Sequence, residues 1–287
     1  MNQKAIKLIE CPRDAMQGIH DFIPTNLKAA YINLLLQVGF DTIDFGSFVS
    51  AKAIPQLTDT REVLAQLDLN NTKSKLLAIV ANLRGAENAM AFPEINYVGF
   101  PFSISETFQQ RNTNSSIKDS LATVEQMLEL CDKHQKTAVV YLSMGFGNPY
   151  GDDYNTEIVE QWASALVDRG TQILSLSDTT GVSTPEKIKE LLPLLIRSFP
   201  STEIGLHLHS TPETRNEKIE AAYVAGCRRF DSALKGFGGC PMAADDLTGN
   251  LATEGLIAYL EEKGEMLNLN MDKWHQAMLM SAKVFTF

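Results

Sequence analysis

The chain has 287 residues, of which 44% are hydrophobic and 21% are charged, so it can bury a large core and is not expected to be disordered as a whole. Its formal net charge is -10, and an acidic chain without a cluster of lysines or arginines is a poor match for nucleic acid or an anionic membrane. No apolar run approaches the ~20 residues that span a bilayer, so we expect neither partner.

The ends of the chain and its cysteines indicate a cytoplasmic protein. Residues 1–4 lead directly into a strand-like segment, which leaves no room for a targeting peptide, and the C-terminal residues form no targeting signal. The cysteines form no CxxC pair, and reduced thiols are the rule in the cytosol. We expect Cys131 and Cys227 to be packing residues.

Short apolar runs rich in β-branched residues alternate with longer segments of helical periodicity. The predicted strands are 5–10, 42–46, 75–80, 96–101, 137–143, 172–177, 203–208 and 228–233. The predicted helices are 24–38, 56–67, 83–91 (the weakest pattern), 117–135, 155–169, 185–198 and 212–225, followed by 252–263 and 271–282. This alternation implies a parallel sheet covered by helices.

About eight strand–helix repeats in this length fit a closed (β/α)8 barrel, the TIM barrel, better than an open doubly wound sheet. We therefore predict an α/β fold with a single catalytic domain over residues 1–287, including a C-terminal helical extension from about 252 to 287. Local signals agree, since Thr184 and Thr211 precede prolines as helix N-caps would. Gly39 and Gly170 stand where glycine ends helices.

Polar residues follow the predicted strands, and the active sites of such barrels lie at the C-terminal ends of the strands. Those ends carry Arg13, Asp14, Gln17, Asp44, Ser47, Asn82, Ser143, Ser177, Asp178, Thr179, His207, His209, Cys240 and Asn250. These residues are the candidates for chemistry.

His207 and His209 give the sharpest local signal. Residues i and i+2 of a strand point to the same face, so two imidazoles at one strand end can converge on one cation. The alternative is a hydrogen-bonded pair without metal. The other histidines, His20, His134 and His275, are typical of surface or loop positions.

Asp14 and Asn250 can complete a metal site with this pair. Strand one neighbours strand eight in a closed barrel, so a carboxylate from strand one can reach the histidines of strand seven, and Asn250 can add an amide oxygen. A mixed nitrogen and oxygen set with open positions suits Mg, Mn or a related divalent cation. For Asp14 alone, a loop cap or a surface ion pair is the alternative.

Three further residues have candidate roles with simpler alternatives. Arg13 can hold a carboxylate or stabilise a developing oxyanion, or form a surface salt bridge. Cys240, in the glycine-rich segment 236–241, can transfer a proton, or its glycines can only shape a turn. Asp178 can bind substrate or orient a ligand, or cap a helix.

Several segments together resemble one family, the metal-dependent aldol/Claisen lyase barrels, and within it the hydroxymethylglutaryl-CoA lyase branch. The opening segment 12–17 (PRDAMQ) resembles the Arg-Asp-Gly-x-Gln motif of the superfamily. The combination spans nearly the whole chain and includes FVS at 48–50, IPQ at 54–56, SDTTG at 177–181, GGCP at 238–241 and TGNLATE at 248–254.

The resemblance implies a role for each matching residue. The implied metal ligands are Asp14, His207, His209 and Asn250, for one divalent cation. Arg13 matches the arginine that steadies the thioester enolate, and Cys240 matches the cysteine that helps move the proton. Other implied active-site or supporting residues are Glu10, Gln17, Asp178 and Glu254, and we add Asp44 and Ser47 as supporting candidates. The implied substrate is an acyl-CoA, and the implied assembly is a homodimer or larger.

Some positions depart from the family pattern. Ala15 replaces a glycine, Asp44 a glutamate, Ser210 an aspartate and Asn148 a cysteine, while Val139 stands at a position expected to be basic. Residues 243–246 make the cysteine loop more acidic than usual. The metal set survives these changes, so they concern the identity of the substrate.

Three functions follow from these observations. The first is cleavage of 3-hydroxy-3-methylglutaryl-CoA to acetyl-CoA and acetoacetate. The second is a related aldolase or acyl-CoA condensing reaction with another substrate in the same barrel. The third is a non-catalytic barrel that binds a metal, which the intact set of candidate residues argues against.

Overall fold

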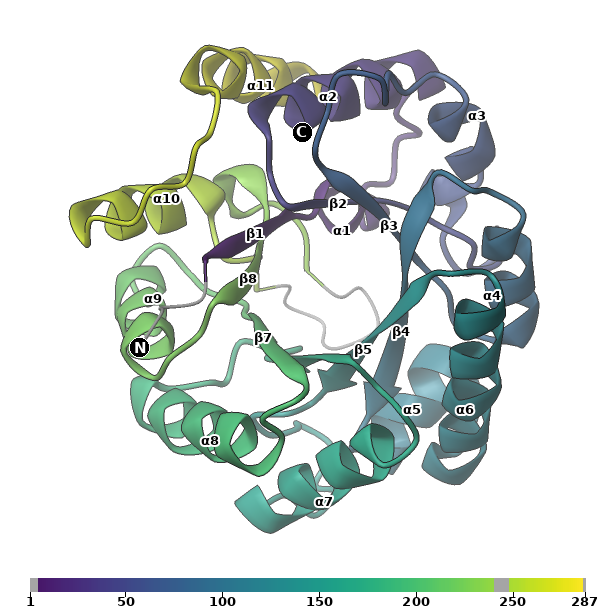
Figure 1. Ribbon diagram of the computed structural model, residues 1–287, viewed down its shortest axis with the longest axis vertical. Coiled ribbons are helices and arrows are strands. Elements are labelled where there is room, and N and C mark those ends of the chain that lie inside the picture. Colours follow the sequence, from purple (N-terminus) through teal and green to yellow (C-terminus); the bar gives the residue numbers. More distant parts are fainter. Residues whose placement is uncertain (1–4, 240–247, 286–287) are drawn as a thin grey trace.

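Eight parallel strands form a closed barrel in the order β1 to β8 (Figure 1). The computed structural model describes residues 5–239 and 248–285. The strands are Lys7–Glu10 (β1), Thr42–Ser47 (β2), Lys75–Ile79 (β3), Ile95–Ser103 (β4), Thr137–Ser143 (β5), Ile173–Ser177 (β6), Glu203–His207 (β7) and Arg229–Ser232 (β8). The predicted (β/α)8 barrel is confirmed.

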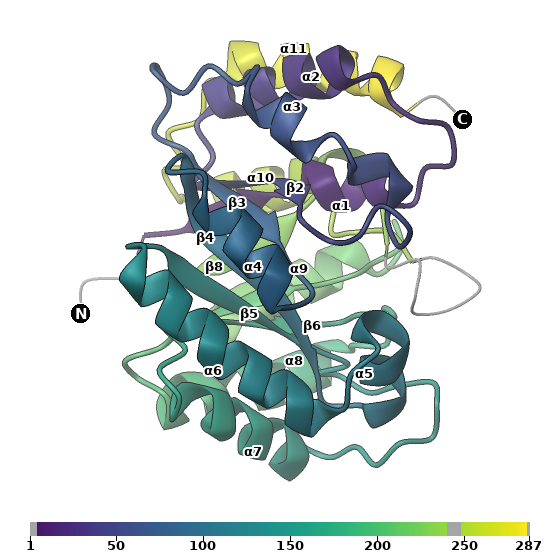
Figure 2. The same cartoon turned by 90° about the vertical axis from the view of Figure 1, so that its right-hand side faces the viewer.

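Helices surround the barrel on its outside (Figures 1 and 2). They are Pro12–Gln17 (α1), Thr25–Val38 (α2), Thr60–Leu64 (α3), Leu83–Met90 (α4), Glu106–Thr113 (α5), Ile117–Lys133 (α6), Thr156–Val167 (α7), Pro185–Ser198 (α8), Arg215–Val224 (α9), Thr253–Glu262 (α10) and Met271–Val284 (α11), with 3-10 turns Pro55–Leu57 (η1) and Leu234–Gly236 (η2). None of these helices is long and apolar enough to cross a bilayer.

The structure corrects some predicted boundaries. The predicted helix 56–67 divides into η1 and α3. The helix predicted from 212 begins at Arg215, because the Thr214 hydroxyl accepts from the Thr211 amide (3.1 Å) and holds a turn there. Helices α1 and α5 were not predicted. Thr184 caps α8 as expected, and Gly39 ends α2 in the left-handed conformation at φ 90°.

The larger part of the core lies between the barrel and its helices, because every strand is largely buried. A second apolar cluster lies apart from it and contains Leu77, Ile79, Tyr97, Val139, Tyr141 and Ile173 from β3 to β6. Every second side chain of a barrel strand points into the barrel, and these six residues occupy such positions. They fill part of the interior and leave the C-terminal end of the strands to polar residues.

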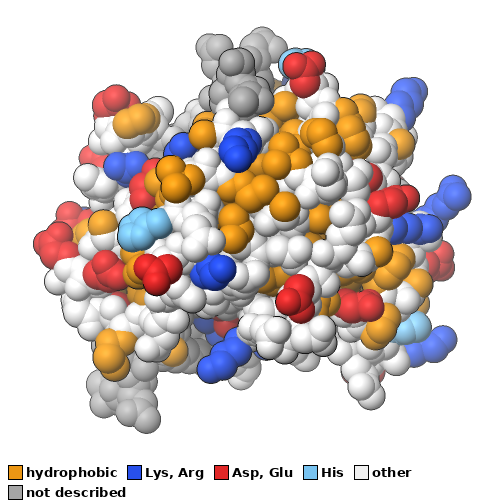
Figure 3. All heavy atoms as spheres, turned by 90° about the horizontal axis from the view of Figure 1, so that it is seen from above, with side chains coloured by type: hydrophobic (Ala, Val, Ile, Leu, Met, Phe, Trp, Pro, Cys, Tyr) orange, Lys and Arg blue, Asp and Glu red, His pale blue; other side chains and the backbone are white. Residues whose placement is uncertain are grey.

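The two C-terminal helices, α10 and α11, extend the fold beyond the eight strands of the barrel. Helix α11 lies against α2 in both ribbon views. The Trp274 ring packs edge-on against Phe40 with centroids 6.1 Å apart, and Phe285 does so against Tyr31 at 5.8 Å. The face that carries these helices, seen from above in Figure 3, shows a patch of exposed hydrophobic side chains. In α11 the Leu279 side chain is 76% exposed.

A buried ion pair anchors the segment after β2 to α2. The Lys28 ammonium group donates to Asp59 Oδ1 (2.7 Å) and to the Gln56 carbonyl, and the Thr25 hydroxyl donates to Asp59 Oδ2 (2.8 Å). Both charged residues are buried. The segment 53–54, which lines the cavity described below, leads directly into this anchor.

We expect Lys28→Met to lower the free energy of unfolding by about 3 kcal/mol, because it leaves the buried Asp59 carboxylate unpaired. Urea unfolding followed by circular dichroism measures the change. The double variant Lys28→Met/Asp59→Asn is the control and should recover part of the loss. Equal losses in the single and double variants would contradict this account.

Candidate metal centre

A cavity of about 120 Å³ opens at the C-terminal end of the barrel. Its lining includes the last residues of four strands, which are Ile79, Ser143, Ser177 and His207. Its polar lining includes Arg13, Asp14, Gln17, His207 and His209, together with Asn112, Ser143, Ser177 and Thr179. Its apolar lining includes Val49, Ala53, Ile54, Ala81, Pro101 and Phe108.

The two histidines of β7 face one another at the edge of this cavity. His207 ends β7, and His209 follows two residues later, with its ring plane tilted by 58° to that of His207. Their Nε2 atoms lie 3.3 Å apart. Two nitrogens that each lie about 2.1 Å from one cation at a right angle are about 3.0 Å apart, so the observed spacing fits two ligands of one metal.

Asp14 joins the pair from α1, directly after β1. Its carboxylate and the ring nitrogens of His207 and His209 all lie within 4.8 Å of one another. Asn250 donates from Nδ2 to Asp14 Oδ2 (2.6 Å), and its backbone forms a bridge with His209. The four predicted ligands therefore come together, and their nitrogen and oxygen donors suit a divalent cation.

The protonation states of His209 and Asp14 favour metal binding. Burial and the neighbouring His207 lower the pKa of His209 to about 4, so its ring is neutral at pH 7, as a ligand must be. Burial alone would raise the pKa of Asp14, but Arg13 and the two histidines outweigh it and hold the pKa below its usual range. For His207, burial would lower the pKa, but Asp231 and Asp14 raise it.

Arg13 is a buried residue, so the surface salt bridge considered for it is wrong. Its guanidinium donates to both oxygens of Asp44 (3.0 and 3.2 Å from Nε, 2.5 Å from Nη2). Nη1 donates to Asp14 Oδ1 (2.8 Å) and to the Gln17 side chain (2.9 Å). Burial raises the pKa of Asp44 to about 6, although Arg13 opposes the shift. The residues predicted at the first two strand ends thus form one network.

Other predicted residues support the loops and do not line the cavity. Asp178 accepts from Lys218 Nζ (3.0 Å) and from the Ser183 hydroxyl (2.5 Å). Ser47 is buried and accepts from the Val49 amide (3.1 Å). Glu254 accepts from the Lys235 amide (3.0 Å) at η2.

Glu10 is buried beneath the loop that follows β8. Its carboxyl accepts from the Leu234 amide (2.7 Å) and the Thr253 hydroxyl (2.6 Å). Burial raises the pKa of Glu10 to about 8, and these hydrogen bonds only partly oppose the shift. Glu10 thus joins β1 to the start of α10.

Cys240 lies outside the described residues, but the structure explains why glycines precede it. Gly238 has φ +99°, and a Cβ there would lie 2.7 Å from both Asn250 Nδ2 and the Asp14 carbonyl. Glycine lets the backbone pass this close to the ligand group. The segment that leads to Cys240 therefore runs against the candidate metal centre.

Comparison with known proteins places the chain in one family. The model of the HMGL-like family matches residues 5–280. The chain belongs to the HMGL-like family. A hydroxymethylglutaryl-CoA lyase from Bacillus subtilis is 36% identical over 262 residues, which cover 91% of this chain and 87% of that protein. A Pseudomonas aeruginosa 3-hydroxy-3-isohexenylglutaryl-CoA/hydroxy-methylglutaryl-CoA lyase is 34% identical and covers 90% and 85%.

Solved structures of HMGL-like relatives share the fold. A Bacillus subtilis HMG-CoA lyase superposes with a TM-score of 0.90 at 34% identity, covering 98% of this chain and 93% of that chain. An Acinetobacter baumannii HMG-CoA lyase in complex with coenzyme A and 3-methylmalate gives a TM-score of 0.90 at 29% identity, covering 99% and 92%.

Two buried residues of this HMGL-like chain escaped the sequence analysis. Lys218 of α9 donates to the His209 carbonyl (2.8 Å), the Gly181 carbonyl (3.0 Å) and Asp178, and so ties the ends of β6 and β7 together. Asp231 of β8 lies 3.3 Å from His207 Nδ1. The alternation of β8 was the available signal for Asp231, because it pairs in register with His207.

We expect Glu10→Gln to flatten the pH dependence of stability. The folded pKa of about 8 exceeds the unfolded value of 4.5, so the folded protein keeps a proton that the unfolded chain releases. Between those values Glu10 makes stability fall as pH rises, by at most about 1.4 kcal/mol per pH unit. The glutamine side chain of the variant does not titrate, and its oxygen can still accept one of the two hydrogen bonds that Leu234 and Thr253 donate to Glu10.

Urea unfolding of both proteins between pH 5.5 and pH 8 measures this difference. The variant should gain stability relative to the wild type as the pH rises. Parallel pH profiles would show that Glu10 titrates alike in the folded and unfolded chains.

Proposed function

We propose that this protein is a hydroxymethylglutaryl-CoA lyase that cleaves 3-hydroxy-3-methylglutaryl-CoA to acetyl-CoA and acetoacetate with one divalent cation, Mg or Mn. The observation that carries the proposal is the convergence of Asp14, His207 and His209 within 4.8 Å at the cavity. Relatives named as lyases of this substrate support it. The chain then acts as one catalytic domain.

Asp14, His207, His209 and Asn250 hold the cation in this proposal. A bound divalent cation supplies a Lewis acid that favours loss of the hydroxyl proton from the substrate. The other ligand positions would be open to substrate, because the candidate ligands named here among the described residues are two imidazoles, one carboxylate and one amide.

The reaction needs only proton transfers and the breaking of one carbon–carbon bond. A base in the site takes the C3 hydroxyl proton, and the O–H electron pair forms the ketone of acetoacetate. The C2–C3 bond breaks, and its electron pair goes to C2 to form the enolate of acetyl-CoA. Arg13 stabilises the enolate oxygen, for which its buried guanidinium is already positioned by Asp44. Cys240 supplies the proton that returns to C2.

The apolar wall favours a second candidate substrate. Val49, Ile54 and Phe108 supply large apolar side chains to the lining of the cavity. Such a wall accommodates a C3 substituent larger than methyl. The Pseudomonas aeruginosa relative is named for such a substrate as well. A 3-hydroxyglutaryl-CoA with a longer C3 alkyl chain is therefore the alternative.

Acetoacetate formation from 3-hydroxy-3-methylglutaryl-CoA by purified protein tests the proposal. We expect turnover with Mg²⁺ or Mn²⁺, none after chelation, and recovery on adding the metal back. His209→Ala should lose at least about a hundredfold in kcat/KM, because a ligand of the cation is removed. His275→Ala, an exposed histidine on α11, is the matched control and should keep wild-type activity.

No acetoacetate from folded, metal-loaded protein would reject this substrate. Turnover of the longer 3-alkyl analogue alone would favour the second candidate. Activity that survives in His209→Ala would reject the assignment of the metal centre.

We propose further that the protein is a cytoplasmic homodimer or larger oligomer without nucleic-acid or membrane partners. The exposed apolar face of α11 supports an apolar contact between copies. We expect Leu279→Glu to shift the mass measured by light scattering after gel filtration toward the monomer, because a buried charge opposes association. An unchanged oligomer would show that the contact lies elsewhere.

A further inference from the structure

A row of polar side chains crosses the barrel interior below the candidate metal centre. The register pairs Tyr141 of β5 with Ser175 of β6, and Ser175 with Gly205 of β7. Arg229 of β8 lies opposite Gly205, and a Cβ at Gly205 would be 2.8 Å from its Cδ. Glycine at 205 therefore makes room for a guanidinium inside the barrel.

Arg229 is a buried cation with unused donors. Its exposed fraction is 1%. Nη1 donates to Glu203 (3.3 Å), and the guanidinium lies 6.0 Å from the Tyr97 ring. Nε and Nη2 have no hydrogen-bond partner in the described part of the chain. A buried guanidinium is costly unless its charge and its donors are matched nearby.

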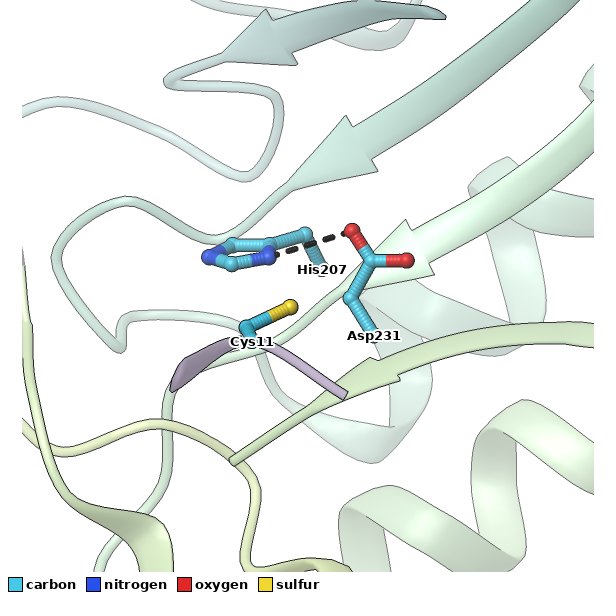
Figure 4. Close-up of side chains that lie close together, drawn as sticks. All are labelled: Cys11, His207 and Asp231. Carbon is cyan, nitrogen blue, oxygen red and sulfur yellow. Dashed lines mark hydrogen bonds and ion pairs between the residues drawn. The ribbon is translucent and has the colours of Figure 1, made fainter. Parts of the chain in front are cut away.

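Asp231, two residues further along β8, carries the complementary charge. Its Oδ2 lies 3.3 Å from His207 Nδ1, and Figure 4 shows the carboxylate beside the imidazole ring. Its Oδ1 has no partner among the described residues, and neither do the Tyr141 and Ser175 hydroxyls. Donors of Arg229 and an acceptor of Asp231 thus remain without a partner inside the barrel, where ordered water can connect them.

We propose that Asp231, balanced by the buried Arg229, is a positioning residue that fixes the orientation of His207 for the metal. The inference rests on the proposed metal centre. A carboxylate that accepts from Nδ1–H leaves the lone pair on Nε2, and Nε2 is the atom that faces His209. Asp231 and Arg229 of β8 thereby set the orientation of His207, a proposed metal ligand at the end of β7.

The same residues invite another interpretation, because Cys11, His207 and Asp231 also lie within 4.8 Å of one another (Figure 4). That group would be a second cation site. The geometry speaks against it, since the Cys11 thiol is directed to the Ile9 carbonyl (3.7 Å) and Nδ1 already faces Asp231. Burial and nearby carboxylates also raise the pKa of Cys11, so the thiol keeps its proton.

Titration calorimetry of the metal-free protein with Mn²⁺ tests the proposal without any substrate. We expect Asp231→Asn to weaken Mn²⁺ binding by about tenfold to a hundredfold, because a neutral amide orients the ring less firmly. Asp59→Asn is the matched control, since it removes a buried, ion-paired carboxylate whose hydrogen-bond partners, Lys28 and Thr25, include none of the candidate metal ligands, and should keep the wild-type affinity. Wild-type affinity in folded Asp231→Asn would overturn the proposal.

The arginine gives an independent arm of the test. Arg229→Lys keeps the interior cation and should bind Mn²⁺ within about threefold of the wild type, whereas Arg229→Met should lose about tenfold. Equal affinities in these two variants would remove Arg229 from the proposal. If Asp231→Asn does not fold, nitrogen NMR of the Mg²⁺-loaded wild type decides, since a His207 Nδ1 without a proton would overturn it.

Cobalt separates the second interpretation from the first. One Co²⁺ per chain without a thiolate charge-transfer band supports the positioning role, and two Co²⁺ with such a band would replace it by a second site. Because none of these measurements uses an acyl-CoA, failure of the lyase proposal would leave their outcome intact.

Discussion

Closure of the sheet between β8 and β1 is the constraint on which the candidate site depends. Four register pairs join these strands, from Lys7 with Arg229 to Glu10 with Ser232. In an open sheet of the same order, the first and seventh strands would lie far apart. With β8 as the only strand between them, Asp14 reaches the histidines that end β7. The candidate metal ligands are therefore held by the barrel as a whole and not by one loop.

Closure of the barrel also brings charged side chains together in a buried region. Arg13 is shared by Asp44 and Asp14, so two buried carboxylates stand against one guanidinium. His209 adds no charge at neutral pH, because its pKa lies near 4. Asp14 shares its guanidinium partner with Asp44, and a divalent cation among Asp14 and the two histidines would add positive charge beside it. The electrostatics and the geometry thus favour the same occupant.

The sequence predicted the barrel because most of the eight strands are largely apolar and the helices between them are mostly long. Short elements escaped it. Helix α1 has six residues, and its polar segment 13–17 resembles a loop as much as a helix. Helix α5 also escaped, although Ser105 caps it, since its sequence carries little apolar periodicity. Periodicity needs more turns than these helices contain.

The candidate site likewise contains residues that the sequence predicted and residues that it did not. Asp14, His207, His209 and Asn250 could be named from the strand ends and the resemblance, and they do come together. The strand ends and the resemblance could not show which side chains contact each other when the two residues lie far apart in the sequence. Asp178 was predicted to bind substrate or to support a ligand, and it accepts from Lys218, forty residues away, which also donates to the His209 carbonyl. Asp231 looked like an ordinary strand residue until the register placed it opposite His207.

The departures from the family pattern acquire a physical meaning in the barrel. Asn148 holds its own loop, since its side chain accepts from the Tyr150 amide (3.0 Å) and donates to the Asp152 carbonyl (3.0 Å). Val139, where a basic residue was expected, packs in the interior cluster with Tyr97 and Tyr141.

Arg229 brings a cation from β8 to the same Tyr97 ring, at 6.0 Å. A positive charge expected on one strand is thus present on another inside the same barrel, although Val139 pairs with Ile173 and Arg229 lies opposite Gly205. Barrel interiors are closely packed, so the glycine on the neighbouring strand provides the volume that the Arg229 side chain fills. Arg229 therefore supplies an interior cation below the candidate metal centre, from a different row than Val139.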